Sequence, residues 1–348
     1  MARNLRVGVQ RGLRQSIGGG LGAGDIFTLS PASFDFSRTN TKDSRITFTR
    51  ASSGTFVGAD GLIKTASTNE ARFDHDPVTR ESLGLLIEEA RTNLLLNSST
   101  LSTQTVTVAA ATHTLSFYGT GTVTLSGVST DGPLVGTGSN QRVDLTFTPT
   151  AGSLILTVSG SVTNAQLEIG SFKTSYIPTT SSQVTRAADI AEITGTNFSS
   201  FFNPEASSVF VDGNIIAGPS GQYVFFAVKK SNSAGSFNIS RRSIQGSRFN
   251  RFNLSNSQDI DFNGPTWIDN SFRKLACAMG QTSASFVDSG SLIGTTTTYT
   301  KPAASDGLTK LLLGEAERGG FKDYNVHIKR LAYFPTRLSD ATLQAITS

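Results

Sequence analysis

The strict alternation of apolar and hydroxyl-bearing residues in the first half of the chain is the feature that most constrains its fold. The stretch TVTVAAATHTLSFYGTGTVTLSG, residues 105–127, repeats its apolar positions mainly with a period of two. Successive side chains of a β-strand point to opposite faces of a sheet, whereas an amphipathic helix repeats every three or four residues. The pattern therefore predicts strands that each bury one face.

A weak internal repeat supports a small sandwich over residues 100–178. LSFYGTGTVTLSG begins at Leu115, and LTFTPTAGSLILTVSG begins at Leu145. We interpret these as two similar hairpins, which is typical of a jelly-roll-like β-sandwich. Pro178 and the Thr/Ser run after it predict a linker over 179–189.

Residues 190–348 predict a second, larger sandwich, because short apolar stretches recur there at close spacing. These stretches are SSVFVDGNIIA, QYVFFAVKK, SFNISRR, RFNRFNL, RKLACAMG, SASFVDSGSLIG, TKLLLGEA and NVHIKRLAYFPTRL. The ending LSDATLQAITS predicts a short helix with Ser339 as its N-cap and a hydrophobic staple between Leu338 and Leu343. The fold class is therefore all-β, with this helix at its end.

The basic character of the chain is concentrated at its start. The formal net charge of the chain is +4. Four positive charges precede the first acid, Asp25, and they come from Arg3, Arg6, Arg11 and Arg14. Residues 1–24 predict a basic, glycine-rich arm, either disordered or ordered on a partner. A clustered basic face, as nucleic-acid binding needs, is not expected. No apolar run approaches the roughly 20 residues of a membrane span, and no secretory signal is expected.

Residues 25–99 predict a leader of short strands. Gly58-Ala59-Asp60-Gly61 is a hairpin turn, followed by a strand over 71–75, a turn over 76–82 and an apolar strand over 83–87. Alternatively, Glu88, Glu89 and Arg91 start a helical turn that runs through 94–96.

Catalytic and metal-binding signals are weak. The stretch FDHDP, residues 73–77, places two aspartates around one of the three histidines. In a strand, Asp74 and Asp76 would share one face and His75 would lie on the other, so we interpret the stretch as polar turn chemistry.

His113 and His327 are expected to be surface or edge residues. Calcium at Asp212 or Asp288 is an alternative to Asx turns. The single Cys277 is expected to be buried and inert. No nucleophile elbow, zinc or phosphate-loop motif is present, which predicts no enzyme, no metal and no cofactor.

The leader also carries a family resemblance. TRASSGTFVGADGLIKTASTNEARFDHDPVTRESLGLLIEEARTNLL resembles a leader of tail-fibre, tail and head-spike proteins of tailed bacteriophages. QLEIGSFKTSYIPTTSSQVTRAAD is similar to the join between jelly roll and lectin domain in these proteins. RKLACAMGQTSASFVDSGSLIG and HIKRLAYFPTRLSDATLQAITS resemble the central hairpin and the end of their concanavalin A/laminin-G-like lectin domain. The resemblance covers residues 45–348 and implies a lectin-like sandwich over 190–348.

The resemblance implies a virion structural protein: a short tail fibre, spike or head fibre on the particle surface. It implies attachment to capsid, portal or tail proteins through the arm, with Arg3, Arg6, Arg11 and Arg14 as contacts. It also implies a homotrimer that binds host surface polysaccharide. A decoration protein without glycan binding and a polysaccharide depolymerase are the alternatives.

Two groups of residues are candidates for the glycan site. Trp267 is a stacking residue or, as we favour, a buried structural one. An acidic polysaccharide would pair with arginines in SRRSIQGSRFNRFNL, although a charged outer face or a subunit interface explains them equally well; they are Arg241, Arg242, Arg248 and Arg251.

Overall fold

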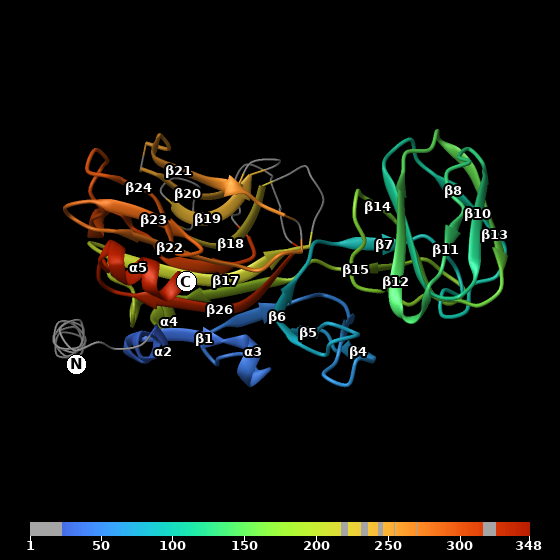
Figure 1. Ribbon diagram of the computed structural model, residues 1–348, viewed down its shortest axis with the longest axis horizontal. Coiled ribbons are helices and arrows are strands. Elements are labelled where there is room, and N and C mark those ends of the chain that lie inside the picture. The colour runs from blue at the N-terminus through green and yellow to red at the C-terminus, as the bar shows by residue number, and fades with distance from the viewer. Residues whose placement is uncertain are drawn as a thin grey trace. The chain divides into compact units, whose positions relative to one another are not determined.

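The computed structural model describes residues 23–216, 222–230, 236–242, 246–253, 255–268, 270–315 and 325–348 (Figure 1). Contacts divide the chain into two compact units. Unit 1 comprises the described residues of Met1–Phe48, Ile190–Ile215 and Pro219–Ser348. Unit 2 comprises those of Thr49–Asp189 and Ile216–Gly218. The segment predicted as a leader, 25–99, is thus shared between the units. Both units are built from antiparallel sheets, so the all-β prediction is confirmed.

In unit 1, the strands of the first sheet run in the order β24-β23-β22-β17-β26, and β1 also pairs with β26. Their bounds are β24 Ser291–Thr296, β23 Ala284–Asp288, β22 Arg273–Met279, β17 Ser207–Ile215, β26 Val326–Phe334 and β1 Ala32–Asp35. Cys277 lies on β22 and is 1% exposed. Burial raises the pKa of its thiol far above the ordinary value, as expected for an inert cysteine.

The second sheet of unit 1 runs in the order β2-β16-β25-β18-β19-β20-β21. Its strands are β2 Thr47–Thr49, β16 Ile190–Thr194, β25 Lys310–Leu313, β18 Gln222–Lys229, β19 Ser236–Arg242, β20 Gly246–Phe252 and β21 Gln258–Thr266. Its apolar face packs on the first sheet, where Phe249 and Phe286 place their ring centroids 6.2 Å apart. Apolar side chains on these two facing surfaces are almost completely buried, which makes the unit a β-sandwich.

Short helices cover the outer face of the first sheet. Helix α5, Asp340–Thr347, packs Leu343 and Ile346 against this sheet, together with Ile26 of α2, Ala23–Ile26, and residues of η1, Phe27–Leu29. Ser339 Oγ accepts a hydrogen bond from the Thr342 backbone N–H at 3.1 Å, so the predicted N-cap is confirmed. The staple residues Leu338 and Leu343 are both buried in the same cluster. The remaining short helices of the unit are α3 Phe36–Thr39, α4 Gly195–Ser199 and η2 Ala304–Asp306.

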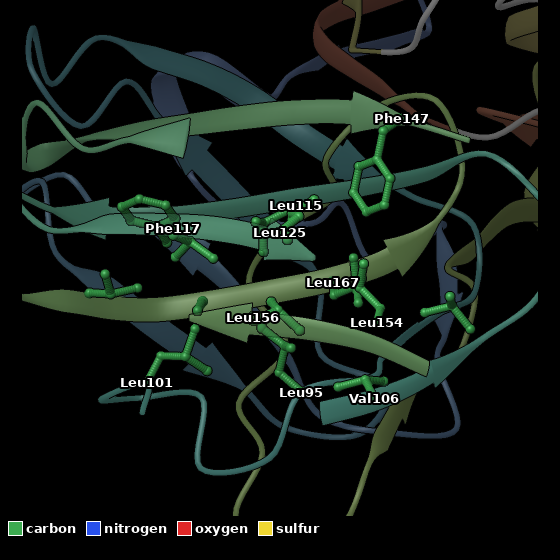
Figure 2. Packing of buried hydrophobic residues seen from close by; sticks show 14 residues of the cluster. Leu95, Leu101, Val106, Leu115, Phe117, Leu125, Phe147, Leu154, Leu156 and Leu167 are labelled. Carbon is green, nitrogen blue, oxygen red and sulfur yellow. The ribbon is translucent and has the colours of Figure 1, made fainter. Parts of the chain in front are cut away.

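Unit 2 contains a smaller sandwich whose core is shown in Figure 2. One sheet runs β11-β10-β13-β8 and the other runs β12-β9-β14. The strands are β8 Gln104–Val108, β9 His113–Gly119, β10 Thr122–Gly127, β11 Leu134–Val135, β12 Gly138–Phe147, β13 Gly152–Ser159 and β14 Val162–Ile169. Leu115 and Phe117 of one sheet and Leu125, Leu154 and Leu156 of the other are buried in this single core.

The internal repeat is not a pair of hairpins. The first copy contains β9 and β10, which lie in different sheets, and the second contains the end of β12 followed by β13, which also lie in different sheets. Each copy is therefore a connection that crosses the core from one sheet to the other. At the first crossing, Gly119 has φ +117, and a Cβ there would lie 2.2 Å from the Ser161 carbonyl oxygen. Alternation fixes which face of a strand is buried, but it does not fix which strand is its partner.

The rest of unit 2 consists of short strands. The predicted hairpin at Gly58–Gly61 is confirmed: it joins β3 Gly54–Val57 to β4 Ile63–Ala66. Strands β5 Arg72–His75 and β6 Ser82–Ile87 also pair. Strand β7, Arg91–Asn93, occupies the start of the proposed helical turn and pairs with β15, Val184–Arg186. The segment predicted as a linker thus contains a strand. No helix of the described chain is long and apolar enough to cross a membrane.

Candidate functional site

The second sheet of unit 1 has one apolar and one polar face, which the alternation within β19 and β20 produces. Phe237, Ile239 and Phe249 point to the core and are at most 1% exposed. Their neighbours Asn238 and Asn250 therefore point to the opposite face.

The strand register aligns the polar residues into rows across this face. Asn238 of β19 lies directly opposite Asn250 of β20, and Asn250 lies directly opposite Asp261 of β21. Directly opposite residues share a face and place their Cβ atoms about 5 Å apart. We call Asn238, Asn250 and Asp261 the asparagine row. In the adjacent row, Ser240 faces Arg248.

The two asparagines carry polar atoms that the described structure leaves unsatisfied. Asn238 is 4% exposed and Asn250 is 1% exposed, and neither side-chain Oδ1 has a hydrogen-bond partner. An unsatisfied buried acceptor costs about 1–3 kcal/mol, and most buried polar atoms in folded proteins are paired. Two such acceptors opposite one another on adjacent strands indicate a place where an external donor binds.

Arg248 and Asp261 close one end of the asparagine row. Arg248 donates from Nε and Nη2 to the two carboxylate oxygens of Asp261, at 2.6 and 2.9 Å. The Arg248 side chain is buried, whereas the Asp261 side chain is 38% exposed. Strand β21 is the last strand of this sheet. The row therefore runs from buried asparagines to a solvent-exposed carboxylate at the sheet edge.

Two of the other predicted arginines, Arg241 and Arg251, do not join Arg248 on this face. Arg251 lies opposite Phe237, on the core side, and donates to Asp259 at 2.7 Å and to Asp306 at 3.2 Å. Arg241 shares the face of Ile239, and its guanidinium carbon lies 5.8 Å from the centre of the Tyr223 ring. The side chain of Arg242 lies outside the described residues. The three described arginines, Arg241, Arg248 and Arg251, therefore do not form one anion-binding cluster.

The arginines predicted to attach the chain to the particle also lie outside the described residues. They are Arg3, Arg6, Arg11 and Arg14.

Trp267 is a buried structural residue in this conformation. It is 4% exposed, its ring stacks on Phe225 with centroids 5.4 Å apart, and its indole Nε1–H donates to the Ser271 carbonyl at 3.1 Å. The Arg273 guanidinium carbon lies 5.0 Å from the ring centroid. A ring covered in this way presents no free face on which a sugar could stack.

The FDHDP stretch forms the end of a strand and a turn. Asp76 Oδ1 accepts from the backbone N–H groups of Val78 and Thr79 at 2.8 and 2.7 Å, which is Asx-turn chemistry. Asp74 accepts from the Val57 N–H at 2.7 Å, and the His75 ring lies 3.2 Å from the Val57 carbonyl. The two aspartates do not share a strand face, because β5 ends at His75.

Two expectations about histidines were wrong, and one of the two residues proposed for calcium, Asp288, is engaged by other side chains. His113 and His327 are 0% and 5% exposed, because β9 and β26 bury them; they are not surface residues. Asp288 accepts from Arg273 at 2.7 Å and from Ser247 at 2.5 Å. Burial raises the pKa of Asp212. Among the residues that the structure describes, no cluster of three or more His, Cys, Asp or Glu residues could hold a metal ion.

Unit 2 contains a buried ion-pair cluster that no sequence pattern predicted. Arg72 and Arg186 pair with Glu88 at 2.7 and 2.6 Å, and Arg50 pairs with Asp189 at 3.0 Å. Arg72 also pairs with Asp189. Burial alone would raise the pKa of Glu88, but Arg186, Arg72 and hydrogen bonds from Ser175 lower it to about 2. The members are at most 2% exposed, so this cluster holds segments together rather than meeting a ligand.

Comparisons with known proteins return fold likenesses only. No protein-family model and no curated protein matches the chain. Among solved structures, the CBM40 of the Ruminococcus gnavus IT-sialidase matches at 18% identity with a TM-score of 0.36, covering 42% of this chain and 84% of that one. A heptameric SAP-like pentraxin from Limulus polyphemus matches at 12% identity with a TM-score of 0.33, covering 42% and 73%.

Sequence reasoning missed the asparagine row, although part of its signal was present. SFNISRR places Asn238 between Phe237 and Ile239, and RFNRFNL places Asn250 next to Phe249, which assigns both asparagines to the face opposite these apolar residues. What the sequence did not supply is the register that sets Asn238 opposite Asn250.

Proposed function

We propose that this chain is a non-enzymatic component of a bacteriophage virion that binds host surface glycans on the polar face of its lectin-like sandwich. The observation that carries the glycan-binding part is the pair of unsatisfied amide oxygens of Asn238 and Asn250. Sugars are dense in hydroxyl donors, and a buried acceptor that gains a donor recovers the free energy that its burial cost.

The geometry of the polar face favours binding over bond cleavage. A general acid or base must exchange a proton with the substrate. The carboxylate of the asparagine row, Asp261, is instead paired with Arg248. Carboxylates engaged in this way orient a ligand or the sheet rather than transfer protons.

The virion part of the proposal rests on the resemblance of the leader and on the basic arm. A short tail fibre, spike or head fibre, in a trimeric assembly, is the form we propose. Deletion of residues 1–24 should abolish incorporation into particles, measured by blotting purified virions. Normal incorporation of the truncated chain would refute attachment through the arm.

The glycan-binding part is tested with the full chain on an array of bacterial surface polysaccharides. Asn238→Leu and Asn250→Leu remove the amide oxygens with little change of volume, and we expect each to weaken binding at least tenfold. The exposed Asn197 of α4 provides the control, and Asn197→Leu should bind as the parent does. Because each leucine removes an unsatisfied buried acceptor, the melting temperatures of the two site variants should stay equal or rise.

The two alternatives predict different outcomes. Shortened polysaccharide chains after incubation with the parent protein would identify a depolymerase. A correctly folded oligomer that binds no glycan would instead favour a decoration protein.

A further inference from the structure

We infer that the asparagine row binds an uncharged sugar unit through two neighbouring hydroxyl groups, and not an acidic sugar through its carboxylate. This inference rests on the proposed glycan-binding function and names the class of ligand. It also departs from the acidic polysaccharide that the arginine-rich sequence suggested.

The chemistry of the unsatisfied atoms selects the ligand. The Oδ1 atoms of Asn238 and Asn250 are acceptors, and both are at least nine-tenths buried. An acceptor in a desolvated site attracts a hydroxyl donor and repels a carboxylate. A ligand that satisfies both atoms must therefore bring two donors.

Arg248, the described arginine on the face of the asparagine row, is already neutralised. It forms a bidentate pair with Asp261. An acidic sugar would have to compete with the Asp261 carboxylate for this guanidinium. A neutral sugar leaves this pair intact.

The register sets the spacing of the two acceptors. Because Asn238 and Asn250 face each other directly, their Cβ atoms lie about 5 Å apart. Their amide oxygens can thus accept from hydroxyls on adjacent carbons of one sugar ring. Asp261 lies next in the row, on the edge strand and partly exposed. The rest of a polysaccharide would leave the site over β21.

The strongest alternative is an acidic sugar whose carboxylate binds to lysines of the same sheet. Lys229 and Lys310 face each other on adjacent strands of the same sheet, and they lie on the polar face because Ala227, two residues before Lys229, faces Asn238. A carboxylated sugar bound to this pair would make affinity depend on salt. An acidic ligand and a lysine variant therefore separate the two interpretations.

The test is titration calorimetry of the full chain with neutral and acidic oligosaccharides at 50 and 500 mM NaCl. At these two concentrations the Debye length is roughly 14 and 4 Å. The neutral probes are glucan, mannan and galactan oligomers, and the acidic probes are oligouronates of matched length. We expect a neutral oligomer to bind with an affinity that changes less than twofold with salt. Asn238→Leu, Asn250→Leu or loss of one of the two adjacent hydroxyls from the sugar should each weaken binding at least tenfold.

Two outcomes would overturn the inference, and they can be told apart. Binding confined to oligouronates, weakened at least tenfold by salt and lost in Lys229→Met, would refute the neutral ligand while leaving glycan binding in place. Failure of every oligosaccharide to bind to folded protein would refute the proposed function as well.

Discussion

At the scale of single residues, the chain buries two kinds of polar group: charged side chains that are paired, and amide oxygens that lack a hydrogen-bond partner. In unit 2, Glu88 meets Arg72 and Arg186 and accepts two hydrogen bonds from Ser175. In unit 1, Asn238 and Asn250 are as deeply buried, but each lacks a partner for Oδ1. A satisfied buried network stabilises one conformation, whereas unsatisfied acceptors cost stability. The contrast is why we assign the first group to structure and the second to ligand binding.

Removing one arginine from the buried cluster should be strongly destabilising. Arg72→Met leaves Glu88 and Asp189 each short of a charged partner, so we expect a loss of about 3–5 kcal/mol in the free energy of unfolding. Urea denaturation measures it. The matched control is Lys64→Met, since Lys64 and Asp60 form an exposed pair that contributes at most about 1 kcal/mol. Equal losses in the two variants would contradict the structural role of the cluster.

The low pKa of Glu88 predicts how stability depends on pH. The pKa is about 2 in the folded chain against an ordinary 4.5, so the contribution of Glu88 is complete above pH 4.5 and is lost as pH falls toward 2. The difference corresponds to roughly 3 kcal/mol. Glu88→Gln should be less stable at pH 7 and should lose less stability than the parent between pH 4.5 and 2. Exposed Glu81→Gln is the control, and a parent-like acid response in Glu88→Gln would contradict the assignment.

At the scale of elements, local sequence signals predicted strands and the helix well, but not their partners. Alternation identified the strands of both sandwiches, and helix α5 begins at its predicted cap. The copies of the internal repeat, interpreted as hairpins, cross between sheets instead. The reason is physical: a strand exposes the same alternating faces whether the next strand pairs beside it or packs across the core from it.

Helix α5 provides a test at this scale. Ser339→Ala removes the side-chain acceptor for the Thr342 N–H, and loss of an N-cap costs about 1 kcal/mol. Ser339→Asp keeps an acceptor and should retain most of the stability. Chemical denaturation followed by Trp267 fluorescence reports on unit 1, which contains this tryptophan, the single one of the chain. Equal destabilisation by both substitutions would show that the side-chain acceptor at position 339 does not stabilise the helix.

At the scale of the whole molecule, the main segment of unit 2, Thr49–Asp189, is an insertion in unit 1. The chain leaves unit 1 after Phe48, within β2, and returns at β16, which begins at Ile190. Strands β2 and β16 are neighbours in one sheet. Entry and exit at adjacent strands allow an inserted unit to fold around its own core.

The insertion predicts that residues 49–189 fold by themselves. This segment contains every strand of the smaller sandwich, its core, and all five charged members of the buried cluster: Arg50, Arg72, Glu88, Arg186 and Asp189. The isolated fragment should show a cooperative thermal transition and dispersed amide resonances. A second fragment, 49–180, omits Arg186 and Asp189 and should be markedly less stable. A fragment 49–189 without a cooperative transition would contradict autonomous folding.

The sequence alone determined the fold class, the positions of most strands and the capped final helix, because alternation and capping are local properties of a few residues. It also predicted the burial of Cys277 and the turn at Asp76. Only the tertiary structure decided how the repeat crosses the core, which charges pair in unit 2, and that Asn238 lies opposite Asn250. Those features depend on register and on partners distant in the chain, and many pairings satisfy the same local pattern. The candidate site therefore became visible only when neighbouring strands aligned two asparagines that the sequence places twelve residues apart.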